Sequence, residues 1–580
     1  MWFQIDVGLS KAVLEAAQAC NISTVDFSPD VRQADLRFGD FQANGVLPYA
    51  KLRRLNPRHV AEQIVEKLRA MGGFPGKIEV NVAGPGFINF KLSGDFLAEW
   101  LNLYKSKNDY ELAMAQNWSK KRIIIDYSSP NTAKQMHVGH LRSMNIGDSI
   151  HRILKFCGAD VIRDNHIGDW GTQFGILIMV IKKKRLHTSD LSLEEIESLY
   201  QQGSALAKEN EDYLSTARNE LVKLQSGDPE NLEIWEAINK ISRVAFDEIY
   251  AEMGVSFDHT LGESFYRDQV HRIYQELEEK HIARMDNGAL CVFHEEHAQF
   301  SEQPFIIRKT DGASNYATTD LATVLYRTET LHADELIYVT DGRQRDHFQQ
   351  LFLTVQKWYA AFGRKCPAMQ HVWFGTILGE DGKAIKTRSG APIKLKELLD
   401  EAKTRAKEIV GEKSKDLSNS EKQHVANVLG IDSVKYADLL PNRTGDYVFS
   451  WEKMLSFDGN TAAYLLYAIA RIKSILRKCN GDVASTTTAD CLETESERNL
   501  VRKLTYFPII LSQAVKELRP HHICTYLFEL TGEYSAFYNA DRVIGEQANV
   551  TSRRLTIILR TLNILETGMH LLGLETLEKM

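Results

Sequence analysis

The spacing of apolar residues in the first part of the chain predicts a small α+β domain. Apolar positions recur at helical spacing over 11–19 and 59–71 and alternate with polar ones over 78–82 and 87–92. The helical period predicts amphipathic helices, and the period of two predicts half-buried strands. A Gly-Pro-Gly sequence between the two strands predicts a turn. We expect this domain to cover residues 1–112.

The second part alternates strands with helices. A short apolar run at 122–127 predicts a buried strand, a helix with one apolar stripe follows, and 159–163 predicts another strand. Strand, helix and strand within about 45 residues are typical of a βαβ unit in a parallel sheet. A further strand at 336–339 repeats the pattern. A charged, largely helical stretch at about 183–300 is interpreted as an insertion into this domain, which we place at 113–450.

The third part is helical to the last residue. Two sets of apolar residues at helical spacing, one at 465–476 and one at 555–565, indicate buried helix faces. We expect an all-α domain over 451–580. The predicted fold is therefore α/β multidomain: a Rossmann-like parallel-sheet domain, an N-terminal α+β domain and a C-terminal all-α domain.

Composition excludes several classes of protein. The net charge of −7 argues against a basic nucleic-acid coat, although local basic patches can still bind nucleic acid. None of the seven cysteines forms a CxxC pair, so neither a zinc ribbon nor a disulfide scaffold is indicated. The longest apolar run, at 174–181, is too short to span a bilayer, and the first residues lack a secretory signal pattern. We expect a cytoplasmic protein with no membrane contact.

One stretch carries candidate chemistry, "SSPNTAKQMHVGHLRS" at 128–143. It follows the first buried strand, where open α/β sheets bind ligands. His137 and His140 lie three residues apart at the start of a helix, and helix N-termini favour anions. Gly139 leaves space for a flat ring such as adenine. The alternative is a pair of surface histidines near a helix cap. Neither a GxGxxG fingerprint nor a GxxxxGK[ST] loop is present.

The wider sequence resembles one family. The segment "DYSSPNTAKQMHVGHLRS" and the following "VIRDNHIGDWGTQFG" resemble the catalytic core of arginyl-tRNA synthetases, and His137 to His140 is similar to the HIGH motif of class I synthetases. "VAGPGFINFKL" resembles the N-terminal additional domain of that family, which recognises the tRNA D-loop. "YLFELTGEYSAFYN" resembles its helical anticodon-binding domain.

The resemblance implies a two-step ligase. The arginine carboxylate would attack the α-phosphate of ATP, with Mg²⁺ accompanying the nucleotide, and the arginyl group would pass to the 3′ end of tRNA(Arg). Donors at His137 and His140 would act on charge that develops in the transition state. The expected partners are L-arginine, ATP and tRNA(Arg), with the protein a monomer and no metal held by protein ligands alone.

The resemblance also assigns residues. The expected catalytic residues are His137, Gly139, His140, Lys386, Arg388 and Ser389, the last three in place of a full KMSKS motif. The expected arginine-binding residues are Asp126, Ser129, Asn131, Tyr316, Asp320 and Gln344. The expected ATP-binding residues are Lys134, His137, Gly139, His140 and His347. The expected tRNA-binding residues are Phe87 and Asn89.

Several alternatives stay open at this point. Asp320 could be a helix N-cap, Gln344 and His347 a polar first helical turn, and Phe87 a core residue. The basic run at 182–185 could touch tRNA phosphates or be a solvated helix end. A different class I synthetase, for example one for cysteine, is the rival enzyme, and a tRNA-binding paralogue without catalysis is the rival outside enzymes.

Overall fold

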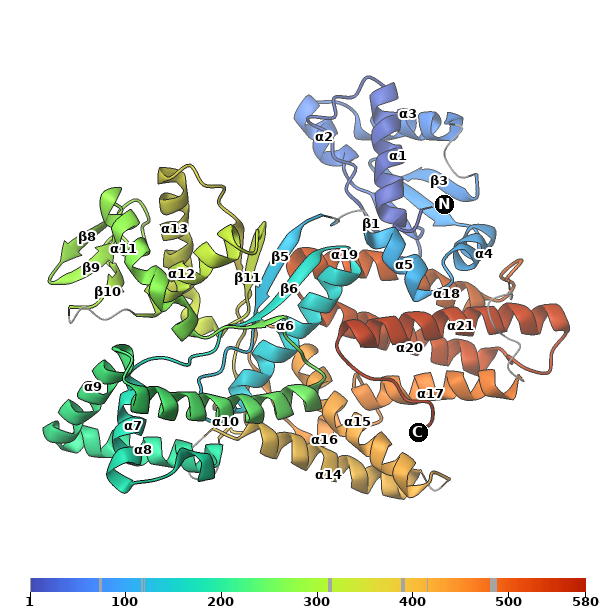
Figure 1. The fold of residues 1–580 in the computed structure, drawn as a ribbon. Coiled ribbons are helices and arrows are strands. Elements are labelled where there is room, and N and C mark those ends of the chain that lie inside the picture. The colour runs from blue at the N-terminus through green and yellow to red at the C-terminus, as the bar shows by residue number, and fades with distance from the viewer. Residues whose placement is uncertain are drawn as a thin grey trace.

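The N-terminal lobe is a four-stranded antiparallel sheet with helices packed on it (Figure 1). In this computed structural model, residues 2–71, 76–115, 118, 120–310, 315–386, 392–414, 416–479 and 488–580 are described. The strands are β1 (Val31–Gln33), β2 (Phe41–Ala43), β3 (Ile78–Ala83) and β4 (Phe87–Leu92), in the order β1-β2-β4-β3. The helices are α1 (Ile5–Ala19), α2 (Val46–Arg53) and α3 (Pro57–Ala70), followed by α4 (Gly94–Leu103) and α5 (Lys107–Met114). The predicted strands and helices of this lobe are therefore confirmed.

A five-stranded parallel sheet forms the centre of the molecule. Its strands are β5 (Arg122–Asp126), β6 (Asp160–Asn165), β7 (His259–Thr260), β11 (Glu335–Tyr338) and β12 (Ala368–His371), in the order β12-β11-β5-β6-β7. The chain leaves β5 toward β6 on one side and later returns to β11 on the other. The strand order therefore reverses between β5 and β11, and the carboxyl ends of these two strands mark the ligand-binding position of an open α/β sheet.

Two lobes are inserted in the chain between strands of this sheet. Between β6 and β7 lie α7 (Thr172–Lys184), α8 (Leu193–Glu209), α9 (Glu211–Gln225) and α10 (Pro229–Met253). Between β7 and β11 lie α11 (Val270–Glu279), α12 (Tyr316–Glu329) and a second sheet of β8 (Ala283–Asp286), β9 (Ala289–Val292) and β10 (Phe305–Arg308). The first lobe has a hydrophobic core built mainly from α7 to α10, whereas the core of the second lobe continues into β5 and β11 of the central sheet.

The second lobe corrects the expectation of a largely helical insertion. Helices α8 to α10 agree with it, but β8 and β9 form an antiparallel hairpin. Asn287 and Gly288, at the turn, have φ of 46° and 83°. An Asn-Gly pair favours a tight hairpin turn because both residues tolerate positive φ. That local signal was present in the sequence and outweighs the charged composition around it.

The remaining chain is mostly helical. It contains α13 (Arg345–Ala361), the parallel pair β13 (Ile377–Leu378) and β14 (Tyr447–Val448), α14 (Leu395–Lys413), α15 (Asn419–Leu439), α16 (Trp451–Met454), α17 (Ala462–Lys478), α18 (Glu495–Leu504), α19 (Phe507–Glu517), α20 (His521–Ala540) and α21 (Ala548–Leu571). One continuous core joins the helices from α14 onward to the N-terminal lobe and to α6 (Val138–Phe156), whereas α13 packs into the core of the lobe between β7 and β11. The predicted α/β multidomain class is confirmed, while the exact domain boundaries at 112 and 450 stay predictions.

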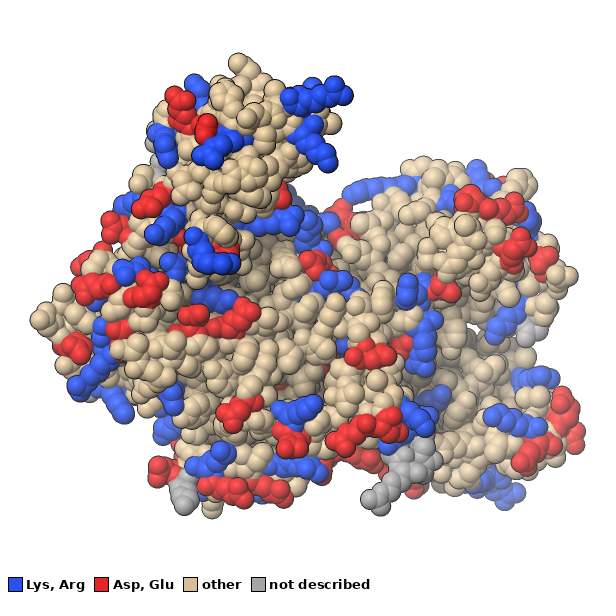
Figure 2. Space-filling model, turned by 180° about the vertical axis from the view of Figure 1, so that it is seen from behind, with Lys and Arg blue, Asp and Glu red and all other residues tan. Residues whose placement is uncertain are grey.

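The surface carries charges of both signs. Seen from behind, Lys and Arg are interspersed with Asp and Glu, and the N-terminal lobe projects beside a deep notch in the outline (Figure 2).

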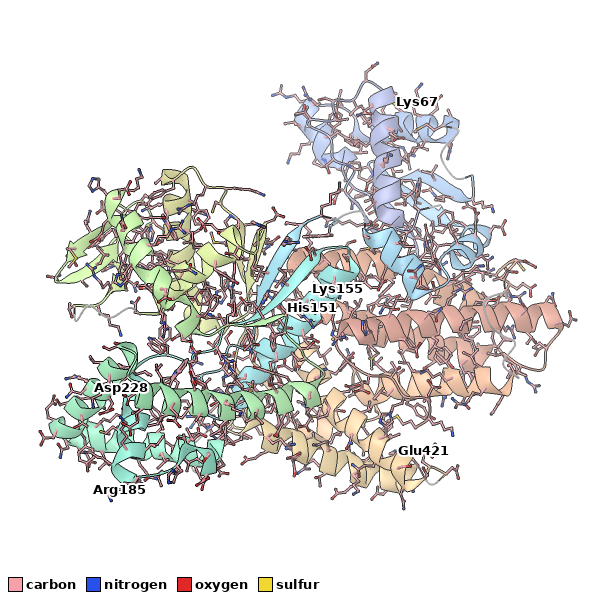
Figure 3. The ribbon with its side chains drawn as sticks, in the orientation of Figure 1. Lys67, His151, Lys155, Arg185, Asp228 and Glu421 are labelled. Carbon is pink, nitrogen blue, oxygen red and sulfur yellow. The ribbon has the colours of Figure 1, made fainter. Side chains whose placement is uncertain are left out.

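The basic run at 182–185 lies at the end of α7, where Arg185 is far from the central sheet (Figure 3). Lys182 forms ion pairs with Glu220 and Glu230 at 3.1 and 2.7 Å. These contacts favour the interpretation of this run as a helix end with partners of its own.

Candidate functional site

The loop that leads from β5 to α6 has an unusual backbone. Ser128, Ser129 and Ala133 have positive φ of 74°, 47° and 65°, and left-handed backbone is costly for residues with a side chain. Side chains from three elements accept the N–H groups of these residues: Ser143 Oγ at 2.9 Å, Asn165 Oδ1 at 3.0 Å and Ser242 Oγ at 2.9 Å, in that order. Helix α6, strand β6 and helix α10 together hold the loop in this conformation.

The two histidines of the loop form the cap of α6. His137 Nδ1 accepts a hydrogen bond from the Gly139 N–H, and His140 Nδ1 accepts one from the His137 N–H, both at 3.0 Å. A neutral imidazole whose Nδ1 accepts must carry its proton on Nε2. The capping bond fixes this tautomer for His137. His140 Nδ1 also lies 3.2 Å from the His137 carbonyl oxygen, so the same tautomer holds for His140 when its Nδ1 accepts from the His137 N–H. The ring centroids are 4.1 Å apart, and with both capping bonds made each ring has an Nε2–H donor for a ligand.

Both rings are held in the neutral form. Burial, followed by the charge of Lys394, lowers the pKa of His137. Burial, followed by the neighbouring His137, lowers the pKa of His140 to about 3. At neutral pH the pair therefore consists of two uncharged donors at a helix N-terminus, where the macrodipole favours negative charge.

The structure gives Gly139 a reason that the sequence did not reveal, while space for a ligand ring at this glycine stays a prediction. A Cβ at this position would lie 2.7 Å from Cε1 of His137. Any larger residue would displace the imidazole and break the capping bond. The glycine is thus required for the histidine geometry itself.

Cations surround the histidine pair. Lys394, Arg343 and Lys134 all contribute positive charge at His137. Lys134 Nζ lies 5.1 Å from the ring centroid of Tyr200 on α8. Lys394 Nζ lies 2.5 Å from Glu197 Oε2, also on α8. Lys394 is a neighbour of the histidines that sequence spacing did not reveal, because it is more than 250 residues away along the chain.

Asp126, at the carboxyl end of β5, already has protein partners. Its Oδ2 forms an ion pair with Arg327 at 2.6 Å, and its Oδ1 accepts from Ser129 Oγ at 2.9 Å. Arg327 also binds Asp164 at 2.8 Å and is 1% exposed. A direct contact between Asp126 and a substrate guanidinium stays a prediction. The observed geometry gives this carboxylate a positioning role, because it holds Ser129 through a hydrogen bond.

Asp320 lies on α12 beside His347. The helix begins at Tyr316, so Asp320 is in its second turn and the N-cap is Asn315. The alternative of Asp320 as an N-cap is therefore wrong. His347 Nε2 lies 2.6 Å from Asp320 Oδ2. Burial lowers the pKa of His347, but the hydrogen bond and charge of Asp320 outweigh it, and the net pKa is raised.

Glu263 is an acidic residue that the sequence did not single out. Burial, followed by the charges of Asp320 and Asp169, raises its pKa to about 8. Among the described residues none donates a hydrogen bond to its carboxylate. Tyr316 lies in the same electrostatic neighbourhood and is 69% exposed. Two acidic groups, only one of them paired, form a site that a cation would stabilise.

Asn131 and Gln344 are both exposed. Asn131 forms a parallel bridge with Gly168, and a Cβ at Gly168 would lie 1.9 Å from Asn131 Oδ1. Gly168 therefore leaves room for the Asn131 amide. Gln344 is the residue before α13, and its side chain makes no cap hydrogen bond.

Comparison with known proteins decides the family. Residues 8–92 match the model of the "Arginyl tRNA synthetase N terminal domain", 102–451 that of "tRNA synthetases class I (R), catalytic domain", and 465–580 that of the "DALR anticodon binding domain". The chain belongs to the arginyl-tRNA synthetase family. The resemblance noted from the sequence is thereby confirmed.

Full-length relatives agree. The chain is 42% identical over 549 residues to the arginine–tRNA ligase of Laribacter hongkongensis, covering 94% of each. It is 41% identical over 557 residues to that of a Marinomonas species, covering 95% of each. The arginyl-tRNA synthetase of Plasmodium falciparum has a similar structure, with a TM-score of 0.83 at 29% identity, covering 100% of this chain and 99% of that one.

The loop that contains Lys386, Arg388 and Ser389, called the signature loop below, lacks the full KMSKS motif of class I synthetases. Lys386 forms an antiparallel bridge with Pro392, and the turn at Asp381-Gly382 joins the two sides of a hairpin, as expected from the sequence. Arg388 and Ser389 lie outside the described residues. Phosphate binding by this loop therefore stays a prediction from its sequence, and Lys386 is the one candidate whose position the described residues include.

The family's N-terminal domain contains the predicted tRNA residues. Phe87 is half-buried on β4, and Asn89 lies two residues further on the same face, 3% exposed. Gln42 on β2 stands directly opposite Asn89, and its Nε2 donates to Asn89 Oδ1 at 2.7 Å. Because this bond occupies Asn89 Oδ1, the Nδ2 group of the same amide is the one that can donate to a ligand. The low exposure of Asn89 was not expected from the sequence.

Two further observations bear on cofactors and membranes. Within the described ranges, no three His, Cys, Asp or Glu side chains gather in a way that would bind a metal ion. The helices in those ranges are too short or too polar to cross a membrane. All seven cysteines are free thiols.

Proposed function

We propose that this protein attaches L-arginine to tRNA(Arg) at the expense of ATP. The observation that carries the proposal is the pair of neutral histidine rings that cap the N-terminus of α6, close to the switch point of the sheet. Neutral donors directed at a phosphate stabilise charge as it develops, which lowers the barrier rather than tightening ground-state binding alone. The proposal is supported by the family membership and by the relatives described as arginine–tRNA ligases.

The substrate amino acid is assigned from charge. A guanidinium is planar and always protonated, and it pairs best with carboxylates. Asp320 and Glu263 supply two carboxyl groups within electrostatic reach of each other. We assign them to the guanidinium, with Tyr316 beside them, and assign Ser129, Asn131 and Gln344 to the α-amino and carboxylate groups.

The nucleotide is assigned to the other side of the histidine pair. Lys134, His137, Gly139 and His140 would bind ATP, with Lys386, Arg388 and Ser389 on the phosphates. His347 was expected at ATP, but its bond to Asp320 favours a position at the arginine end. Mg²⁺ would be held mainly by ATP phosphates and water, as is usual for this ion, because no three His, Cys, Asp or Glu side chains of the described residues are arranged to hold a metal ion.

The proposal extends to tRNA and to the state of the protein. Phe87 would stack on an unstacked D-loop base and Asn89 would read its edge, and the helices from α17 to α21 would bind the anticodon. We further propose a monomer that works in the cytoplasm with these three substrates.

The decisive experiment is aminoacylation of total tRNA with each amino acid in turn. We expect arginine alone to be attached. Attachment of cysteine or another amino acid would favour the rival class I enzyme. Tight tRNA binding with no attachment of any amino acid would favour a paralogue without catalysis.

A further inference from the structure

A short segment after the signature loop pairs with the start of the histidine motif. Val138 N–H donates to the Ile393 carbonyl at 2.9 Å, and Leu395 N–H donates to the Met136 carbonyl at 3.0 Å. These two bonds flank an antiparallel bridge between His137 and Lys394. Opposed residues of this non-hydrogen-bonded kind have side chains on the same face, with Cα atoms only about 4.5 Å apart. The side chain of Lys394 thus leaves the backbone beside that of His137.

Helix α8 of the inserted lobe holds two cations of this region. Glu197 Oε2 binds Lys394 Nζ at 2.5 Å and accepts from Gln135 Nε2 at 3.3 Å. Three residues further along the same helix face, Tyr200 places its ring against Lys134. The side chains of Lys394 and Glu197 are 26% and 15% exposed, so this ion pair is partly shielded from solvent.

We propose that Lys394 is a further ligand of the ATP phosphates and that Glu197 is its counter-ion in the protein without nucleotide. The inference rests on the function proposed above and goes beyond it. Lysine is a compact charge on a flexible stem, so it can leave a carboxylate for a phosphate nearby. ATP carries several negative charges, and Glu197 carries one. The exchange also compensates for a signature loop whose lysine pattern is incomplete.

Substitution of the two partners separates this role from a purely structural one. Lys394→Met should raise the KM for ATP by about 10- to 100-fold in arginine-dependent pyrophosphate exchange with tRNA present, the range expected when a charge-assisted hydrogen bond is lost. Glu197→Gln should lower the KM for ATP by about two- to fivefold, because a competing negative charge is removed. An ion pair that only stabilised the fold would give effects in the same direction for both variants.

A matched control is available in the first turn of α14. Lys396 also forms an ion pair with a neighbouring element, to Glu252 at 3.0 Å, and it binds Asp400 on its own helix. Lys396→Met should leave the KM for ATP at the wild-type value. The KM for arginine should stay within about twofold in all three variants, because the carboxylates around Asp320 are untouched.

The outcomes distinguish failure of this inference from failure of the proposed function. If the wild type attaches no arginine to tRNA, the proposed function is wrong. If the wild type is active and Lys394→Met keeps the normal KM for ATP, Lys394 is not a phosphate ligand. If a thermal unfolding measurement shows that Lys394→Met is not folded, the KM for ATP is measured for Lys394→Gln and Glu197→Gln instead. A change of the KM for ATP in the same direction in both variants would overturn the inference.

Discussion

At the scale of single residues, the capping role of the two histidines determines their chemistry. His137 Nδ1 accepts a backbone N–H, so its Nε2 must donate, and the same holds for His140 when its Nδ1 accepts from the His137 N–H rather than donating to the His137 carbonyl. A lysine at either position could donate but would add a full charge. An asparagine could cap, but its donor and acceptor belong to one short amide and would not reach a ligand from the far side of a ring. The structure thus explains why two imidazoles stand at this helix end.

The first prediction concerns these donors. His137→Ala or His140→Ala should lower the rate of adenylate formation by about 10²–10³-fold, as for other donors that act in the transition state. The KM for arginine should change little, since the acidic site is separate. The measurement is pyrophosphate exchange at saturating arginine and tRNA. A variant with normal turnover and only a raised KM for arginine would contradict the assignment.

The second prediction is a pH dependence of arginine binding. The pKa of Glu263 is about 8 in the free protein, so at pH 7 this group is mostly protonated. A guanidinium beside it favours the ionised form, so binding releases a proton. By linkage, the affinity for arginine should rise as pH increases from 6 to 8 and then level off. Loss of the proton from His347 frees Asp320 and acts in the same direction.

Glu263→Gln is the test of that prediction. Calorimetry in buffers of different ionisation enthalpy should show proton release on arginine binding to the wild type. The variant should release fewer protons, bind arginine more weakly at pH 8, and have a flatter pH profile. An unchanged profile would show that Glu263 does not face the substrate.

At the scale of elements, partners from distant segments fix the groups that the sequence singles out. Loop 128–133 is held by side chains from α6, β6 and α10. Strand β2 orients the Asn89 amide on β4 through Gln42. In both places a hydrogen bond between two elements fixes one polar group in one orientation. The position of the loop backbone and of the Asn89 amide therefore depends on how the elements pair and not on one sequence motif.

The third prediction tests the strand pairing. Gln42→Glu replaces a donor with a carboxylate, which should accept from Asn89 Nδ2 and turn the amide so that Oδ1 faces the tRNA. We expect kcat/KM for tRNA to fall about tenfold, mainly through KM, because one wrongly placed hydrogen bond costs about 1–3 kcal/mol. Aminoacylation is measured with tRNAs altered at each D-loop base. If the wild type attaches arginine equally to all of them, Asn89 reads no base there.

At the scale of the whole molecule, the parts proposed to bind tRNA and the candidate site share one framework. Asp40 of the N-terminal lobe forms an ion pair with Arg502 on α18, and Asn102 pairs with the backbone of Ala489 through bonds of 2.9 and 3.0 Å. Ser149 on α6 donates to the Leu571 carbonyl at the end of α21 at 2.9 Å. The C-terminal half of α6, marked by His151 and Lys155 in Figure 3, thus faces the C-terminal helices.

The fourth prediction follows from this framework. Arginine activation should require tRNA, because the helix that carries His137 and His140 packs on the helices proposed to bind the anticodon. The effect is a population shift and needs tRNA to bind the competent arrangement more tightly. Pyrophosphate exchange should be absent without tRNA and restored by tRNA that lacks a reactive terminal ribose. Full exchange in tRNA-free protein would rule the requirement out.

The sequence by itself determined the main elements and the family, and it predicted a chemistry for the motif. The apolar periods at 59–71, 87–92 and 122–127 predicted α3, β4 and β5, because burial of one face imposes its period on the chain. The sequence placed His137 and His140 at the start of α6, since a helix N-terminus is specified by residues close together in sequence, but their capping bonds emerged only from the structure. The β8–β9 hairpin was missed, although its Asn-Gly turn is a local signal.

Only the tertiary structure decided which distant groups meet. Glu263, Arg327 and Lys394 come from three separate segments, and sequence periodicity holds no information on contacts between such segments. Their roles depend on low dielectric and short separation: burial beside Asp320 keeps Glu263 protonated, and a salt bridge from Arg327 commits Asp126 to the protein interior. The sequence motif therefore specified the candidate donors for phosphate, while folding selected the charges that surround them, because electrostatic interactions depend on distance in space and not on distance along the chain.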